Sequence, residues 1–191
     1  MFNGIIKNNA IIKKISYKEK ACELIIKSKN KLKSIRIGDS VCCNGVCLTV
    51  IKKNGNYLKF FVSNETLKKS NFKQAKKGDL INIETSLKYG DEISGHYVQG
   101  HVDCTSKVKN IFIKNKTWFV DLLINKNFIR YLKYKSSISL NGVSLTITKV
   151  TNTGFQVSII PHTLKLTNLK DLKKHKHVNT EIDIFGKYIL G

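Results

Sequence analysis

A repeated heptapeptide is the feature that most limits how this chain can fold. Residues 44–50 read Asn-Gly-Val-Cys-Leu-Thr-Val, and residues 141–147, which lie 97 positions later, read Asn-Gly-Val-Ser-Leu-Thr-Ile. The same displacement aligns Thr-Leu-Lys at residues 66–68 with Thr-Leu-Lys at residues 163–165. A constant register of this kind is typical of a duplicated structural unit, and each half is large enough for a small domain. The predicted domains are residues 1–97 and 98–191.

Short apolar and β-branched runs fill both halves, and Gly, Asn and Asp residues separate them. Such runs between turn residues are typical of β-strands. Because closing a sheet removes the unpaired edges that an open sheet must protect, several short strands in a unit of this size favour a closed barrel. We therefore predict an all-β fold of two tandem barrels with short helices. The predicted strands are residues 41–43, 46–51, 58–62, 80–83, 138–140, 143–150, 155–160 and 178–184, and the predicted helices are residues 65–70, 127–134 and 162–167.

The composition is that of a soluble globular protein. Hydrophobic residues make up 41% and charged residues 25% of the 191 residues, which excludes a disordered or fibrous chain. No apolar run in the sequence approaches the roughly 18 residues of a membrane span. Residues 1–7 also lack the basic and then apolar layout of a signal peptide. We expect a cytoplasmic protein without a membrane partner.

The net charge of +21 allows two interpretations. A strongly basic chain is compatible with a nucleic-acid partner. However, only two of the 34 basic residues, Arg36 and Arg130, are arginines, and sites that read phosphates or bases usually use the bidentate guanidinium of Arg. We favour a solvated, lysine-rich surface without a specific nucleic-acid partner, and a functional basic surface remains the alternative.

The five cysteines indicate neither a metal site nor a disulfide framework. They are Cys22, Cys42, Cys43, Cys47 and Cys104, an odd number without a Cys-x-x-Cys pair. No histidines accompany them at zinc-finger spacing. We expect no metal ion and expect most of these thiols to be buried as small hydrophobic side chains.

Duplicated barrels most simply offer two related small-molecule pockets. If two copies of one molecule bind and play unequal parts, a few polar groups must differ between the pockets. Drift after duplication would also produce such differences, so both explanations stay open. The aligned pairs that differ in this way are Cys47 with Ser144, Glu65 with His162, and Gly4 with His101.

The junction between the halves, residues 95–101, carries two glycines and two histidines. Glycine lets the backbone approach a ligand closely, and the pKa of histidine suits proton transfer near neutral pH. We take His101 as the candidate acid or base because it lies at the start of the second repeat. The alternative is that the junction histidines serve packing or a turn.

Five segments of this sequence, in order and spacing, resemble riboflavin synthases of the α-chain type along essentially the whole chain. The resemblance implies two six-stranded Greek-key barrels, each binding one 6,7-dimethyl-8-ribityllumazine. It also implies a dismutation in which one lumazine donates a four-carbon unit to the other, giving riboflavin and 5-amino-6-ribitylaminouracil without a metal or an organic cofactor. The matching segments are residues 1–6, 44–50, 95–103, 141–147 and 160–164.

The resemblance also implies functional residues. His101 is the candidate acid or base, Cys47 and Ser144 are polar or nucleophilic contacts to the two rings, and Ser40 and Asp183 are supporting polar groups. The first pocket is expected to contain Gly4, Ile5, Ile6, Cys47, Leu48, Thr49, Phe61, Val62, Ser63, Asn64, Glu65 and Thr66, with Phe2 at its edge. The second is expected to contain Gly100, His101, Val102, Lys135, Ser144, Leu145, Thr146, Ser158, Ile159, Ile160, Pro161, His162 and Thr163.

Assembly is a further expectation from the resemblance. Members of the family pair the first barrel of one chain with the second barrel of another in a homotrimer, and lumazine synthase is an implied partner. The chain departs from the family pattern at Asn3, at Gln99 and in its short carboxy-terminal segment after residue 184. The competing function is that of a non-catalytic antenna protein that binds a lumazine or a flavin without converting it.

Overall fold

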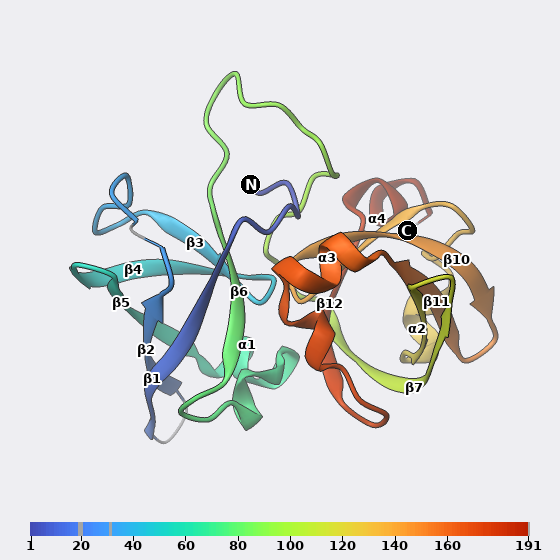
Figure 1. The fold of residues 1–191 in the computed structure, drawn as a ribbon, viewed down its shortest axis with the longest axis horizontal. Helices are drawn as coiled ribbons and strands as arrows, with labels where there is room; N and C mark the ends of the chain where they lie inside the picture. The colour runs from blue at the N-terminus through green and yellow to red at the C-terminus, as the bar shows by residue number, and fades with distance from the viewer. Residues whose placement is uncertain (19–20, 31, 191) are drawn as a thin grey trace.

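The computed structural model describes residues 1–18, 21–30 and 32–190. Within these residues each half forms a closed barrel of six antiparallel strands (Figure 1). The strands of the first barrel follow the order β1-β2-β5-β4-β3-β6. They are β1 (Asn8–Lys18), β2 (Ala21–Ser28), β3 (Ser40–Cys43), β4 (Val46–Asn54), β5 (Tyr57–Ser63) and β6 (Leu80–Thr85).

The second barrel repeats this arrangement in the order β10-β11-β8-β7-β12-β9. In both barrels the second strand pairs with the fifth and not with the third, as in a Greek key. The predicted all-β fold of two tandem barrels is therefore confirmed. The strands are β7 (Cys104–Lys114), β8 (Thr117–Leu123), β9 (Ser137–Leu140), β10 (Val143–Thr151), β11 (Gly154–Ile159) and β12 (His177–Ile182).

Short helices connect the strands. The predicted helix at residues 127–134 is only one turn long, and the predicted strand at 178–184 ends at Ile182 because the carboxylate of Asp183 accepts the Phe185 N–H and a helix begins. The other predicted elements match the structure within one to three residues at each end. The helical segments are α1 (Asn64–Lys69), η1 (Asn71–Gln74), α2 (Lys126–Ile129), α3 (Pro161–Leu166), η2 (Asn168–Asp171) and α4 (Ile184–Leu190).

Each barrel has its own apolar core because side chains alternate along the strands. In β4, Val46, Leu48 and Val50 are buried, whereas Cys47 and Thr49 lie on the outer face. The same alternation recurs in β10. The repeated heptapeptide thus encodes both an inner apolar face and an outer polar face in each half.

The two barrels meet at the hairpin turns before β4 and β10. Asn82 Nδ2 donates to the Asn141 carbonyl at 3.0 Å, and Asn179 Nδ2 donates reciprocally to the Asn44 carbonyl at 2.8 Å. At Gly45 an added Cβ would lie 2.8 Å from the backbone nitrogen of the opposite turn, so the turns approach too closely for a side chain. The halves are therefore related by an approximate two-fold arrangement.

The structural equivalence between the halves contains a one-residue shift. Ile81 of β6 and Val178 of β12 are 97 positions apart, but their strand partners Ala10 and Ser106 are only 96 apart. Residues before β3 therefore align with a displacement of 96. The predicted pairing of Gly4 with His101 is wrong for this reason.

The connection between the barrels runs from the end of β6 at Thr85 to the start of β7 at Cys104. Figure 1 shows that part of it projects above both barrels, beside the amino terminus. Within the connection Val98 forms a bridge with Phe2, with N–H···O distances of 2.7 and 3.1 Å. The predicted domain boundary near residue 97 falls in this segment and stays a prediction.

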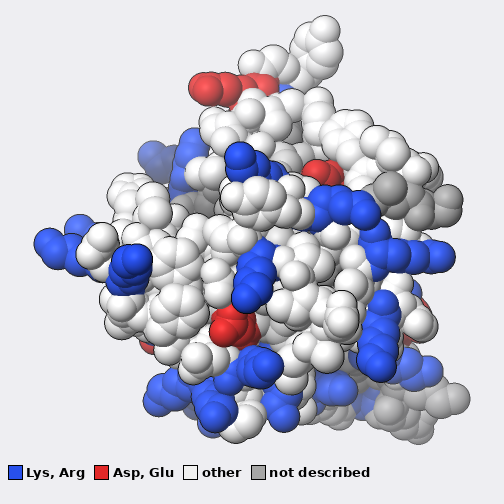
Figure 2. Space-filling view, turned by 90° about the vertical axis from the view of Figure 1, so that its right-hand side faces the viewer, with Lys and Arg blue, Asp and Glu red and all other residues white. Residues whose placement is uncertain are grey.

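The surface matches the lysine-rich composition. Figure 2 shows Lys and Arg side chains spread among uncharged residues over the face of the second barrel. Among the described residues no helix is long and apolar enough to cross a membrane.

Candidate functional site

The segments that precede the first strands of the two barrels exchange places. Gly4 precedes β1 of the first barrel, but its carbonyl accepts the N–H of Ser144 in the second barrel at 2.8 Å. Gly100 precedes β7 of the second barrel, and its carbonyl accepts the N–H of Cys47 in the first barrel at 2.8 Å. We call residues 3–6 and 99–102 the crossing segments. Each half is therefore completed by backbone from the other half.

The side chains follow the same exchange. Ile6 packs into the core of the second barrel, and Val102 packs against the core of the first barrel. The expected pockets grouped Gly4, Ile5 and Ile6 with Cys47, and grouped Gly100, His101 and Val102 with Ser144. The structure shows the reverse grouping, because the crossing segments leave their own barrels.

Both crossing segments need a glycine where they touch the partner strand. Gly4 has φ +74° and Gly100 has φ +80°, in the left-handed region that other residues rarely occupy. A Cβ added at Gly4 would lie 2.7 Å from the Ser144 Cβ, and one added at Gly100 would lie 2.6 Å from the Cys47 Cβ. Gly4 and Gly100 are thus the equivalent pair.

A carboxylate holds each crossing segment, half-buried in the case of Glu84 and buried in the case of Glu181. Glu84 on β6 accepts the N–H groups of Asn3 at 2.7 Å and Gly4 at 3.0 Å. Glu181 on β12 accepts those of Gln99 at 2.6 Å and Gly100 at 2.9 Å. Burial raises the pKa of Glu84, and it raises the pKa of Glu181 to about 7. In both cases the N–H donors oppose the effect of burial.

The first candidate site is the outer face of β4 and β5. Cys47 and Thr49 point outward from β4, and Ser40 shares this face because it pairs directly with Thr49. Phe61 points outward from β5 and is 56% exposed. The crossing segment brings the exposed His101 close to β4, because the carbonyl of the preceding Gly100 accepts the Cys47 N–H. An aromatic ring, hydroxyls, a thiol and an imidazole are thereby gathered where a planar heterocycle can stack.

The end of this face is formed where β5 passes into α1. Ser63 Oγ caps the helix by accepting the Thr66 N–H at 3.2 Å, and Glu65 forms an exposed ion pair with Lys69. Asn64 is half-buried at the helix start. Leu48 and Val62 are buried in the barrel core, so only their backbone is available to a ligand.

The second candidate site is the equivalent face of β10 and β11. Ser144 and Thr146 point outward from β10, and Ser158 does so from β11. Ile5 of the crossing segment lies where His101 lies in the first site. Leu145 and Ile159 are buried in the core. This face is therefore less polar at the crossing segment than the first.

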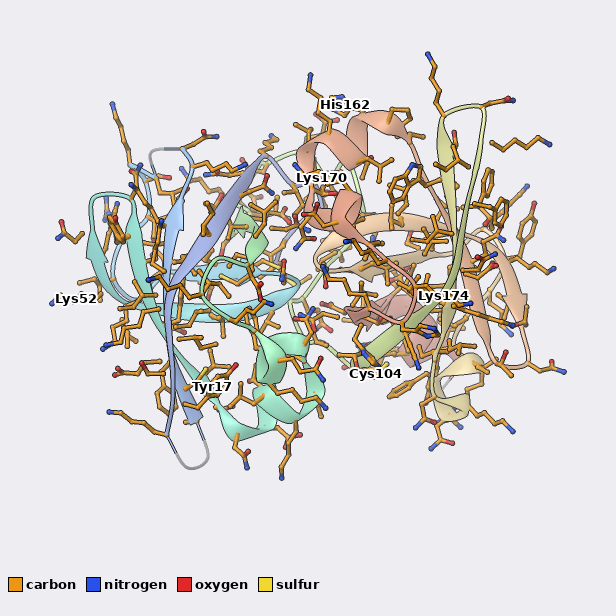
Figure 3. The ribbon with its side chains drawn as sticks, turned by 60° about the horizontal axis from the view of Figure 1, so that its bottom comes forward. Tyr17, Lys52, Cys104, His162, Lys170 and Lys174 are labelled. Carbon is orange, nitrogen blue, oxygen red and sulfur yellow. The ribbon has the colours of Figure 1, made fainter. Side chains whose placement is uncertain are left out.

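The edges of the second site differ from those of the first. α3 begins at Pro161 and has no side-chain cap hydrogen bond at its start. His162 projects outward from this helix (Figure 3), and Thr163 is half-buried. Ile160 is exposed. Lys135 is held near Thr146 because its N–H donates to the Ile147 carbonyl at 2.9 Å.

The structure adds a site residue that the sequence did not single out. His96 Nδ1 lies 2.7 Å from Ser144 Oγ, and the imidazole is 9% exposed with Nε2 unpaired within the described residues. Burial lowers the pKa of His96, and the nearby carboxylate of Asp183 opposes this. The predicted supporting residue Asp183 therefore lies in the second site, through His96. The presence of two histidines at the junction was the available signal, but spacing did not show which strand each would meet.

Cys47 has a different environment from Ser144. Its half-buried side chain packs with Phe2, Cys42 and Val98. Phe2 is fully buried in this cluster and so lies under the crossing segments, not at an open pocket edge. Burial raises the pKa of Cys42 well above its usual range. All five cysteines are free, and the described residues contain no cluster of three or more His, Cys, Asp or Glu side chains arranged for a metal ion.

Two cavities lie beside the candidate faces. One of about 470 Å³ adjoins Ile5 and Glu84, and one of about 520 Å³ lies between the barrels near Asn44 and Asn141. Neither includes Cys47, Ser144 or His101 among its walls.

Comparison with known proteins supports this two-part arrangement. The pattern of the lumazine binding domain matches residues 3–86 and again residues 99–183. Both matches include a crossing segment at their start, and their first residues are 96 positions apart, as in the structural equivalence.

Curated relatives match nearly the whole chain. The riboflavin synthase of Actinobacillus pleuropneumoniae is 36% identical over 190 residues, which are 99% of this chain and 88% of that protein. The riboflavin synthase of Bacillus subtilis is 34% identical over 189 residues, again 99% of this chain and 88% of that protein. The chain belongs to the riboflavin synthase family.

Solved structures extend the riboflavin synthase family likeness to a binding protein. The crystal structure of LumP complexed with riboflavin has a TM-score of 0.86 and 27% identity, and covers 95% of this chain and 99% of that chain. LumP complexed with 6,7-dimethyl-8-(1'-D-ribityl) lumazine has a TM-score of 0.85 and 25% identity with the same coverage. The riboflavin synthase fold therefore occurs with both lumazine and flavin ligands.

Proposed function

We propose that this chain converts two molecules of 6,7-dimethyl-8-ribityllumazine into riboflavin and 5-amino-6-ribitylaminouracil. The observation that carries the proposal is the likeness to riboflavin synthases over nearly the entire chain, with both halves matched. The four-carbon unit that passes to the acceptor consists of two ring carbons of the donor lumazine and the two methyl carbons attached to them. The rest of the donor, which contains the uracil ring, becomes the second product. Atoms therefore balance without an added oxidant, reductant or metal.

The two candidate faces fit the needs of this reaction. One methyl group must lose a proton, and the partner ring must be activated by addition. We assign acid and base work in the first site to His101, and contacts to the rings to Cys47 and Ser144. Ser40 supports the first site, and Asp183 with His96 supports the second.

Stacking two substrates requires two faces that meet. β4–β5 and β10–β11 belong to separate barrels on opposite sides of the molecule (Figure 1). We therefore propose that the first site of one chain faces the second site of another, within a homotrimer. Alignment of two reactants in this way is worth about 7–11 kcal/mol of barrier when the geometry is good. Lumazine synthase, which supplies the substrate, is a proposed partner, and the cytoplasm is the proposed location.

The deciding experiment is to incubate the purified protein with 6,7-dimethyl-8-ribityllumazine, without metal or cofactor, and to follow riboflavin by absorbance and fluorescence. Steady conversion that is strongly slowed in His101→Ala would support the enzyme. The second candidate function is binding without conversion, which the likeness to LumP structures holding a lumazine or riboflavin supports. It predicts tight lumazine binding and no riboflavin at any protein concentration.

A further inference from the structure

The carboxylates of Glu84 and Glu181 each stand in one barrel but hold backbone that lines the site of the other; Glu181 is buried and Glu84 is half-buried. Glu84 belongs to β6 of the first barrel, and the Gly4 backbone that it binds continues to the Ser144 N–H in the second site. Glu181 belongs to β12 of the second barrel, and the Gly100 backbone that it binds continues to the Cys47 N–H in the first site. The same geometry thus occurs twice, with the barrels exchanged.

We propose that Glu84 and Glu181 are positioning residues that act crosswise: Glu84 shapes the second site, and Glu181 shapes the first. The inference rests on the proposed function, because the two faces are taken as ligand sites. It goes beyond that function by assigning a role to two residues that act through the backbone of the crossing segments.

The chemistry of the contact explains why a carboxylate is needed. Two consecutive N–H groups point at the two oxygens of one side chain, and a carboxylate is an acceptor at both oxygens. A glutamine amide has one acceptor oxygen, and its NH₂ group would face an N–H donor. Gly4 and Gly100 are buried, so an N–H that loses its acceptor has no access to water and the segment must shift.

A shift of the crossing segment would directly move residues on the ligand face. In the first site the residue after Gly100 is His101, and in the second site the residue after Gly4 is Ile5. The contacts of Gly4 and Gly100 with their partner strands leave no room for a side chain, so the tolerance for movement toward these strands is small. Glu181→Gln should therefore weaken the first site, although residue 181 lies in the second barrel.

The test is a site-resolved titration of the full chain with riboflavin, the product, which is not converted on its own. Backbone amide NMR signals of Cys47 and Ser144 report on the first and second sites. In Glu181→Gln we expect the Cys47 reporter to require about 10-fold more riboflavin for half-saturation, as loss of one buried hydrogen bond implies. The Ser144 reporter should change less than about two-fold. Glu84→Gln should show the opposite pattern.

The matched control is Asp79→Asn in the turn before β6, where the carboxylate accepts the exposed Lys76 N–H at 2.9 Å and should affect neither reporter. If either glutamine variant fails to fold, Glu181→Asp and Glu84→Asp keep the charge and should give smaller changes at the same crosswise sites. An effect in the carboxylate's own barrel, equal effects on both reporters, or no effect would overturn the proposal. If wild-type protein forms riboflavin, such results count against the crosswise role alone; absence of wild-type conversion counts against the proposed function.

Discussion

The two halves have the same backbone fold but differ in the side chains around Cys47 and Ser144, the equivalent residues of the two candidate sites. In the second half, Ser144 is hydrogen-bonded to the buried imidazole of His96. In the first half, the equivalent Cys47 packs against Phe2 and Cys42, and His101 lies on the open face. Duplication therefore supplied the frame twice, and a few side chains make the two sites unequal. A reaction between two identical substrates needs this inequality, because one must donate and the other accept.

The largest expected effect comes from breaking a crossing segment. Gly100→Ala places a Cβ 2.6 Å from the Cys47 Cβ, so we expect turnover to fall by about 100-fold, as misplacement of site groups by about 1 Å implies. Gly78→Ala is the matched control, since Gly78 also has positive φ but has no atom within 4 Å of the added Cβ. Steady-state rates with the lumazine substrate measure both. Equal losses in the two variants would mean that backbone strain, and not the crossing contact, matters.

The next effect tests the group found only in the second half. His96→Ala leaves the Ser144 hydroxyl without its partner, and we expect a loss of about 10-fold in kcat. If the pair acts as a unit, the double variant with Ser144→Ala should be no slower than Ser144→Ala alone. His175→Asn, at an exposed turn position with φ +70°, should be neutral. Losses that multiply in the double variant would separate His96 from Ser144.

A smaller effect comes from exchanging the thiol of Cys47 and the hydroxyl of Ser144. Ser144→Cys replaces a short hydrogen bond with a weak sulfur contact, and we expect about a five-fold loss of turnover. Cys47→Ser should stay within about three-fold of wild type, since Cys47 is assigned a ring contact and a serine fits the equivalent position of the other half. A large loss in Cys47→Ser would instead assign covalent chemistry to the first site.

The smallest effect concerns stability. Glu181 has a folded-state pKa of about 7 against an ordinary value of 4.5, mainly through burial. Between these values the folded chain holds a proton that the unfolded chain has lost, so the free energy of unfolding should fall as pH rises through this window. Lys187 of α4 lowers this pKa, while Asp103 before β7 raises it; Cys42 of β3 also lies near enough to couple to Glu181.

Urea denaturation between pH 5 and pH 8 measures this slope. Glu181→Gln should reduce it, leaving the contribution of Glu84, whose pKa burial also raises. Asp79→Asn should leave the slope of wild type intact. An unchanged slope in Glu181→Gln would assign the pH dependence to another group.

The sequence predicted the parts of the fold that local chemistry determines. The heptapeptide predicted a turn and an alternating strand in each half. The apolar runs between turn residues predicted β3, β4, β5 and β6 and their equivalents in the second half. β1, β2, β7 and β8 were not predicted. The strand alternation of β1 is broken where its register shifts between Ile12 and Lys14, and that of β7 where its register shifts between Val108 and Asn110. The one-residue shift before β3 also stayed hidden, since the constant register is carried by residues after it.

The sequence indicates a set of candidate site residues, which stays a prediction, but not how they divide into two groups. The exchange of crossing segments depends on contacts between Gly4 and Ser144 and between Gly100 and Cys47, which are far apart in the sequence. His96 was missed for the same reason. Long-range backbone pairing, and not the side-chain pattern, decides which half each junction residue serves.

The most direct test of the account is a crystal structure of the chain with riboflavin bound. We expect one flavin ring on the face of Thr49 and Phe61, in contact with His101, and a second on the face of Thr146 and Ser158, in contact with Ile5. Flavin in the cavity of about 520 Å³ between the barrels, or a first-barrel flavin that touches Ile5 in the same chain, would contradict it.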